Sequence, residues 1–135
     1  MAKSVIADTA LIAAFLDRRD NHHKWALLQA EELPIPWLVC EPVLTETFFV
    51  LEPKYGDALI TWLQRGSLRI AFNLADELEP VLTLMKKYAN VPMSLADACI
   101  VRMTEIVSDP IVLTTDSDFR VYRRHSRQVI PCRMP

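Results

Sequence analysis

The chain has 135 residues, a length that predicts a single domain over residues 1–135, large enough to bury a core. Its net charge of −2 means that any binding of nucleic acid must come from a local basic patch. Hydrophobic residues make up 51% of the chain, yet no run of about 18 apolar residues occurs, so we expect no transmembrane helix. The start of the chain does not resemble a signal peptide, because Asp8 interrupts its apolar part.

The few cysteines and glycines exclude further classes of protein. Cys40, Cys99 and Cys132 are odd in number, far apart and mostly in apolar surroundings. This pattern favours reduced core thiols in a cytoplasmic protein over disulfides or a zinc site. The two glycines, Gly56 and Gly66, exclude a glycine-rich phosphate loop. The high apolar fraction indicates a surface that faces a partner, either a second copy in a homodimer or a helical segment of another protein.

Short apolar strands alternate with helices along the whole chain. The predicted elements, in order, are a strand at 3–7, helices at 10–17 and 22–32, a strand at 37–40, helices at 42–51 and 57–65, a strand at 68–71, an amphipathic stretch at 74–88 that is helical at least after Pro80, a helix at 94–105, a strand at 110–114, a helical turn at 116–122 and a strand at 128–130. The alternation predicts an α/β fold of three α/β/α layers around a central parallel sheet of about five strands. Right-handed crossovers then place the strand-to-helix turns at one edge, where such sheets bind ligands.

Acidic residues gather at this predicted edge. Asp8 follows the first strand, and Asp116 follows the fourth, with Asp118 two residues later. Asp97 lies in the first turn of the apolar helix at 94–105. Glu46 lies on or beside the apolar face of the helix after the second strand, where a carboxylate is rarely buried without a partner.

Each acid also has a purely structural explanation. Asp8, Asp97 and Asp116 could each cap a helix, and Glu46 could reach solvent from a helix edge. These explanations do not account for several carboxylates at one edge of the sheet. Two carboxylates about 5 Å apart repel by roughly 3 kcal/mol at an effective dielectric near 20, so a fold keeps such a cluster only when a cation compensates the charge. A site made only of oxygen ligands suits Mg²⁺ or Mn²⁺, and these ions commonly serve hydrolysis at phosphorus.

The ordered set of motifs resembles the PIN domain family. The motifs are I-A-D-T ending at Thr9, V-L-T-E-T-F around Glu46, M-S-L-A-D-A-C-I around Asp97 and T-T-D-S-D-F starting at Thr114. The resemblance covers essentially the whole chain, and the length without an added domain is similar to that of VapC-type toxins. It implies an endoribonuclease that uses Mg²⁺ or Mn²⁺ to hydrolyse RNA phosphodiester bonds, as the toxin of a type II toxin–antitoxin pair.

The resemblance also implies roles for the acids. Asp8 and Asp97 would be the main metal ligands. Glu46 and Asp116 would hold a second ion or its water, and Asp118 would support them. A shift of the helix register would move the role of Glu46 to one of its neighbouring glutamates.

Two hydroxyls and two histidines complete the resemblance. Thr9 and Thr114 match hydroxyl positions that orient the site. His22 and His23 match a helix in which the family often has a histidine. We interpret both histidines as structural, because an oxygen-rich Mg²⁺ site does not favour imidazole.

The C-terminal part of the chain is basic. Between 120 and 133 there are five arginines and no acid. The stretch is either a solvated tail or a rim that attracts RNA phosphates beside the metal site, and Arg18 and Arg19 could extend that rim. The candidates for RNA contact are Arg120, Arg123, Arg124 and Arg127.

Large apolar side chains come from the helices between the first and third strands, and we expect them mostly in the core: Trp25, Phe48, Phe49, Trp62 and Leu63. In the toxins that this chain resembles, the same helical region forms a groove for an antitoxin helix.

Two other functions are weighed against the ribonuclease. A non-catalytic PIN-like module for protein interaction or RNA binding would keep the fold and be indifferent to metal. A phosphatase or receiver domain also has an Asp at a strand end, but Asp8 is followed by Thr9 and Ala10, so the D-x-D pattern and the paired acids are absent from the sequence.

Overall fold

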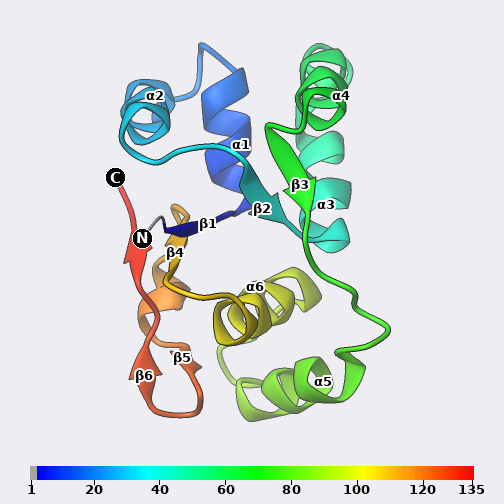
Figure 1. The fold of residues 1–135 in the computed structure, drawn as a ribbon, viewed down its shortest axis with the longest axis vertical. Coiled ribbons are helices and arrows are strands. Elements are labelled where there is room, and N and C mark those ends of the chain that lie inside the picture. Colours follow the sequence, from blue (N-terminus) through cyan, green and yellow to red (C-terminus); the bar gives the residue numbers. More distant parts are fainter. Residues whose placement is uncertain (1–2) are drawn as a thin grey trace.

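The computed structural model describes residues 3–135, and five of its strands form one parallel sheet, most of which can be followed in Figure 1. Every neighbouring pair in this sheet runs parallel. The spatial order is β3 (Leu68–Ile70), β2 (Trp37–Val39), β1 (Ser4–Ala7), β4 (Pro110–Leu113) and β7 (Cys132–Arg133). The order reverses between β1 and β4, which makes that gap the topological switch point of the sheet.

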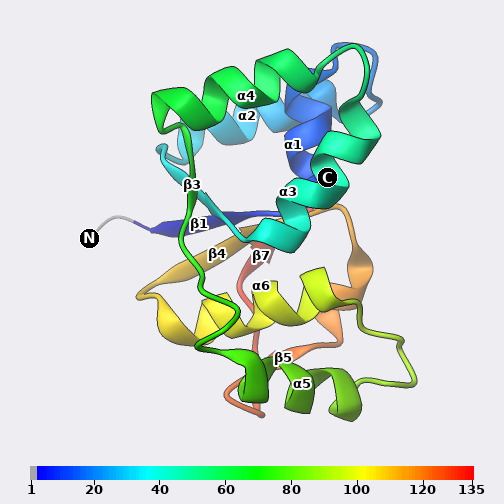
Figure 2. The ribbon, with the colours of Figure 1, turned by 90° about the vertical axis from the view of Figure 1, so that its right-hand side faces the viewer.

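Helices cover both faces of the sheet, as Figure 2 shows with one group of helices above the strands and one below. The upper group is α1 (Thr9–Leu16), α2 (His23–Glu32), α3 (Glu41–Leu51) and α4 (Gly56–Arg65), and the lower group is α5 (Leu78–Lys87) and α6 (Leu95–Ile106). The predicted three-layer α/β/α fold with a parallel five-stranded sheet is therefore confirmed. Pro80 lies in the first turn of α5, where its missing N–H leaves no intrahelical bond unmade.

The fifth strand of the sheet is not the one that the sequence predicted. The stretch 128–130 contributes β6 (Gln128–Val129), which pairs antiparallel with β5 (Arg123–Arg124) in a separate hairpin. The reason is a tight turn: His125 and Ser126 take positive φ angles of 50° and 67°, and the N–H of Arg127 donates to the carbonyl of Arg124. The chain reaches the sheet only after this turn, at β7.

Strands β1 and β4 are buried on both faces, which explains their continuous apolar sequences. Helix α6 is buried around most of its circumference, as its composition predicted. All three cysteines are free, and Cys40 and Cys99 lie in the core, as expected for reduced thiols. Within residues 3–135 no helix is long and apolar enough to cross a bilayer.

The register of the two central strands places the site. Ala7 of β1 pairs with Leu113 of β4, so the residues that follow the two strands emerge side by side. The N–H of Asp8 donates to the carbonyl of Leu113 at 3.0 Å and ties the two strand ends together. This edge is also where α1 and the short helix η1 (Ser117–Arg120) begin.

Candidate active site

Asp8 lies at the centre of the carboxyl edge and is only 8% exposed. One of its carboxylate oxygens accepts the N–H of Thr9 at 2.8 Å and caps α1, and the other accepts the hydroxyl of Thr114 at 2.8 Å. The pKa of Asp8 is raised to about 6, mainly by burial and to a smaller extent by the charges of Asp97 and Asp116, while the two hydrogen bonds oppose the rise. Asp8 is thus both a helix cap and a member of an acidic cluster.

Thr114 joins Asp8 to the segment after β4. Its fully buried hydroxyl donates to Asp8 and accepts the backbone N–H of Asp116 at 3.0 Å. Asp116 in turn accepts the N–H of Asp118 at 2.9 Å and caps η1. The hydroxyl of Thr114 therefore fixes the position of Asp8, after β1, relative to the backbone of Asp116, after β4.

Asp97 reaches the same place from the opposite layer. It forms a capping box with Ser94, in which its N–H donates to the Ser94 hydroxyl at 3.0 Å. Its Oδ2 atom also accepts the phenol hydroxyl of Tyr122 at 2.9 Å. Burial raises the pKa of Asp97, and the charge of Asp116 adds to that rise.

Tyr122 is a site residue that sequence reasoning missed. The side chain is completely buried, and its ring packs edge-on against Phe119 and Tyr88. Burial, followed by the charge of Asp97, raises the pKa of its hydroxyl. The only available signal was general, namely that a buried tyrosine hydroxyl needs a hydrogen-bond partner.

Glu46 is the most exposed of the predicted acids. The hydroxyl of Thr9 donates to its Oε2 atom at 3.1 Å and also lies 3.4 Å from the carbonyl of Val43. Thr9 thus links the first turn of α1 to α3 and turns the carboxylate of Glu46 toward the other acids.

A hollow of about 640 Å³ lies at the edge of the sheet, and Asp8, Asp97 and Asp116 are among the residues that line it. The structure brings together four of the five predicted acids in its walls, and Asp118 is not among the lining residues. The connection between α1 and α2 supplies part of the opposite wall. The lining residues with chemical significance are Asp8, Thr9, Arg19, Asp20, Asn21, His22, Glu46, Asp97 and Asp116.

The two histidines differ in position. His23 holds the carbonyl of Ala14 through Nδ1 at 2.7 Å, which is the structural role that the sequence predicted. His22 is exposed and lines the hollow, together with Arg19, whose Nε also lies 3.3 Å from a carboxylate oxygen of Asp17. The basic side chains at the hollow thus come from the α1–α2 connection.

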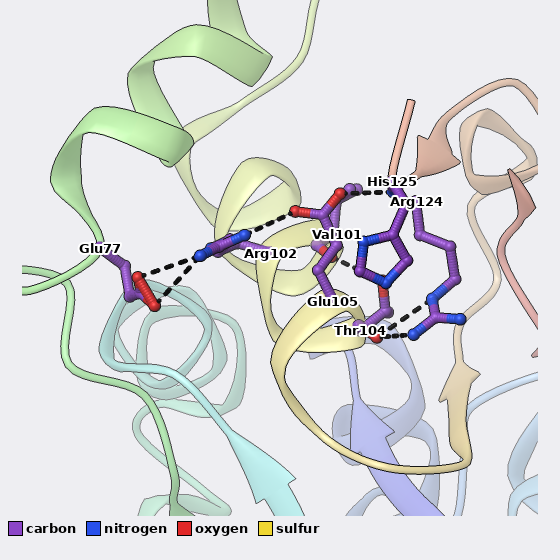
Figure 3. A network of polar contacts seen from close by, with 7 residues as sticks. All are labelled: Glu77, Val101, Arg102, Thr104, Glu105, Arg124 and His125. Atoms are coloured by element: carbon purple, nitrogen blue, oxygen red, sulfur yellow. Dashed lines mark hydrogen bonds and ion pairs between the residues drawn. The ribbon is translucent and has the colours of Figure 1, made fainter. Parts of the chain in front are cut away.

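Two of the four arginine candidates for RNA contact, Arg123 and Arg124, bind backbone carbonyls. The guanidinium of Arg123 donates to the carbonyls of Arg120, Val121 and Tyr122. The guanidinium of Arg124 binds the carbonyl of Thr104, near the far end of α6 from Asp97 (Figure 3). The structure therefore brings neither group to the hollow, because backbone carbonyls take up their donors.

The other two arginine candidates, Arg120 and Arg127, are exposed. Phe49, which the sequence placed mostly in the core, is 85% exposed, whereas Trp25, Phe48, Trp62 and Leu63 pack partly buried against the core. The reason is the helical register of α3: Phe48 turns toward the core and Phe49 away from it.

The donor set of the hollow fits a hard divalent cation. In the described part of the chain, no three His, Cys, Asp or Glu side chains converge closely enough to form a finished metal site. Yet the charges of Asp97 and Asp116 contribute to the raised pKa of Asp8, and the charge of Asp116 contributes to that of Asp97. None of the ion pairs among residues 3–135 involves these three acids. Mg²⁺ keeps several of its coordinated waters, so it needs only a few carboxylate oxygens and enough space for those waters.

Comparisons with known proteins identify the family and the fold. The model of the PIN domain family matches residues 5–124. A search of curated proteins found no match. Among solved structures, the fold is similar to that of Mycobacterium tuberculosis VapC20, a Sarcin-Ricin loop cleaving toxin, with a TM-score of 0.72 and 22% identity over 87% of this chain and 94% of that one. Proteins of the matched family are nucleases that generally use divalent metal ions. The chain belongs to the PIN domain family.

Proposed function

We propose that this protein is an endoribonuclease that hydrolyses RNA phosphodiester bonds with Mg²⁺ or Mn²⁺. The observation that carries the proposal is the gathering of Asp8, Asp97 and Asp116, from three separate elements, in one hollow where no ion pair within residues 3–135 compensates them. Like charges brought together in this way destabilise a fold unless a cation joins them. The fold shared with a toxin that cleaves RNA supports RNA as the substrate.

We assign the ligands by analogy with the PIN domain family. Asp8 and Asp97 would hold the main ion, and Glu46 and Asp116 would hold a second ion or its water, with Asp118 in support. When bound, such an ion lowers the pKa of a bound water and neutralises charge on the phosphate.

The uncharged side chains of the site position the carboxylates. Thr114 keeps one oxygen of Asp8 occupied and sets the backbone of Asp116, so the two carboxylates keep their relative orientation. Thr9 holds Glu46 beside them. This preorganisation means that the carboxylates need little rearrangement when an ion and a phosphate arrive.

The RNA backbone needs basic side chains near an acidic hollow. Arg19 and His22 line that hollow, and we propose that they meet phosphates on either side of the reacting one. The exposed Arg120 and Arg127 stay candidates for a more distant part of the RNA.

We further propose that the protein is the toxin of a type II pair. Phe49 and Val50 of α3 are 85% and 58% exposed, and Val50 also lines the hollow. An exposed phenylalanine next to a residue that lines a charged hollow suits a partner helix that covers the site. The homodimer predicted from the apolar composition also stays a prediction.

An RNA cleavage assay tests the nuclease. Defined RNAs are incubated with the purified protein in Mg²⁺, in Mn²⁺ and in EDTA, and thermal melts are recorded in the same buffers. We expect cleavage only with metal, and a stabilisation of about 2.7 kcal/mol at a hundredfold excess of ion over its dissociation constant. Melting and RNA binding that are indifferent to metal, without cleavage, would instead identify a non-catalytic PIN-like module.

The toxin assignment has a separate test. The chain is expressed alone and together with the product of any small neighbouring reading frame. We expect growth arrest from the chain alone, rescue and co-purification with the neighbour, and loss of co-purification in Phe49→Asp. Unimpaired growth with an active nuclease would remove the toxin assignment and leave the ribonuclease.

A further inference from the structure

A second pocket, of about 440 Å³, lies beside the acidic hollow. Glu46 lines both cavities, and Ala96 lines the second pocket while the next residue, Asp97, lines the first. The walls come from the first two turns of α3, the first turn of α6 and the connection after β3. They consist of Glu41, Pro42, Thr45, Glu46, Phe72, Leu74, Leu95 and Ala96. A group bound in the hollow and a group bound in this pocket would therefore lie next to each other.

The chemistry of the second pocket differs from that of the first. Most of its wall is apolar, from side chains such as Phe72, Leu74 and Leu95. Its ionisable groups are both carboxylates, Glu41 and Glu46, so a phosphate or another anion does not suit it. The fitting occupant is a mostly apolar group that carries N–H donors toward a carboxylate.

A nucleobase with an exocyclic amino group has these properties. Its faces pack against apolar side chains, and carboxylates accept hydrogen bonds from amino groups such as N4 of cytosine. Uracil has the same shape as cytosine but presents a carbonyl oxygen at that position. This oxygen and the carboxylate oxygens are all hydrogen-bond acceptors, so they would repel one another. The pocket therefore distinguishes two bases of equal size by hydrogen bonding.

We propose that this pocket holds the base of the nucleotide next to the cleaved phosphate and prefers a base with an exocyclic amino group over uracil. The assignment rests on the proposed ribonuclease function, because the phosphate is placed in the acidic hollow. It adds a specificity site on α3 and α6 that the acidic cluster alone does not provide.

The test uses RNA octamers that differ only by cytosine or uracil on each side of the cleaved bond. Initial rates are measured in Mn²⁺, and binding of the same octamers is measured in EDTA, where no cleavage occurs. We expect cytosine to be preferred at one flanking position by about fivefold or more, the lower end of the discrimination from a good contact to a base edge.

Two variants locate the preference. Glu41→Gln keeps the shape but adds an N–H donor for the uracil carbonyl, so the preference should fall to about twofold or less, a loss of about one such contact. Glu52→Gln, on the residue that follows α3 and outside the pocket, is the matched control and should keep the preference. Leu95→Trp fills the pocket from a residue that is 38% exposed and should raise KM more than it lowers kcat.

The outcomes separate this inference from the function on which it rests. Metal-dependent cleavage with equal rates and equal binding for both bases at every position overturns the base pocket and leaves the nuclease. A cytosine preference in binding without any cleavage keeps the pocket and overturns the nuclease. A Leu95→Trp variant that cleaves normally but loses self-association or a co-purified protein assigns the pocket to a protein contact and overturns the proposal.

Discussion

The two ends of helix α6 carry charge in opposite ways. At its first turn, Asp97 lies near Asp8 and Asp116, and no ion pair among residues 3–135 involves these acids. At its last turns, Arg102 pairs with Glu77 at 3.5 Å and with Glu105 at 3.2 Å (Figure 3). Paired charges contribute to stability, whereas like charges gathered without a counterion reduce it and mark a site that binds something else.

One short segment contacts α6 at both ends. Tyr122 donates to Asp97 in the first turn, while the N–H of His125 donates to Glu105 at 2.6 Å, and Arg124 binds the carbonyl of Thr104 (Figure 3). The first turn and Thr104 are about 10 Å apart along the helix axis. The basic segment near the C-terminus thus fixes the position of α6, and with it the orientation of one acid of the site.

The largest expected effect, on the rate of RNA cleavage, comes from replacing Asp97 in the first turn of α6. Asp97→Asn removes one like charge and nearly keeps the shape, so cleavage should fall by about a hundredfold or more, as expected when a metal ligand is lost. In EDTA at pH 7 the variant should be at least as stable as the wild type, because the fold disfavours the charged form of Asp97.

Urea melts in EDTA and in Mn²⁺, alongside cleavage rates, measure both effects. Glu105→Gln, near the other end of the same helix, is the control and should lose stability but keep cleavage. An Asp97→Asn protein that is less stable in EDTA and still cleaves RNA would mean that Asp97 is only a helix cap.

The second prediction concerns pH. The pKa of Asp8 is about 6 in the fold against 3.8 ordinarily, so the folded protein binds a proton that the unfolded chain releases. Stability in EDTA should therefore fall as pH rises from about 3 to 7, most steeply between about 4 and 6, by about 3 kcal/mol in total from this group. Urea melts across this range should show the slope in the wild type and not in Asp8→Asn. Equal slopes in both proteins would contradict the assignment to Asp8.

The third prediction breaks the paired end. Arg102→Met leaves Glu77 and Glu105 without their cation, and the side chain of Glu105 is only 9% exposed. We expect a loss of about 1–3 kcal/mol in the free energy of unfolding, with unchanged stabilisation by Mn²⁺ and unchanged cleavage. Lys3→Met, which breaks an exposed pair with Asp109, is the control and should change stability by less than about 1 kcal/mol. Loss of cleavage in Arg102→Met would show that the two ends of α6 are coupled.

The smallest change in stability is expected from two tyrosine hydroxyls. Tyr122→Phe and Tyr88→Phe each remove one hydrogen bond and keep the ring, so each should cost about 1 kcal/mol. Tyr88 holds only the backbone N–H of Arg123, whereas Tyr122 holds Asp97. Only Tyr122→Phe should therefore weaken Mn²⁺ binding, by about tenfold, measured from the ion dependence of the melt. Equal weakening in both variants would reduce Tyr122 to a packing residue.

The sequence by itself determined the layers of the fold and the core of the site. Short apolar strands between helices are sufficient to predict a parallel sheet, since both faces of such strands must be covered. Residues that directly follow parallel strands must meet at one edge, so Asp8, Thr114 and Asp116 could be placed together from their positions alone. Asp97 could be added because it begins a helix that is apolar on most faces.

The tertiary structure decided what depends on contacts between distant or irregular segments. The apolar stretch at 128–130 looked more like a sheet strand than Cys132–Arg133, but the tight turn at His125 and Ser126 directs it into the hairpin. The basic composition of the C-terminus left open a solvated tail or a phosphate rim, and only the packing shows that Arg124 binds the carbonyl of Thr104. No local pattern connects Tyr122 with Asp97, because their hydrogen bond exists only once the hairpin lies along α6. Composition and the spacing of apolar residues thus determine which helices and strands form, whereas the partner of each polar side chain depends on how those elements pack.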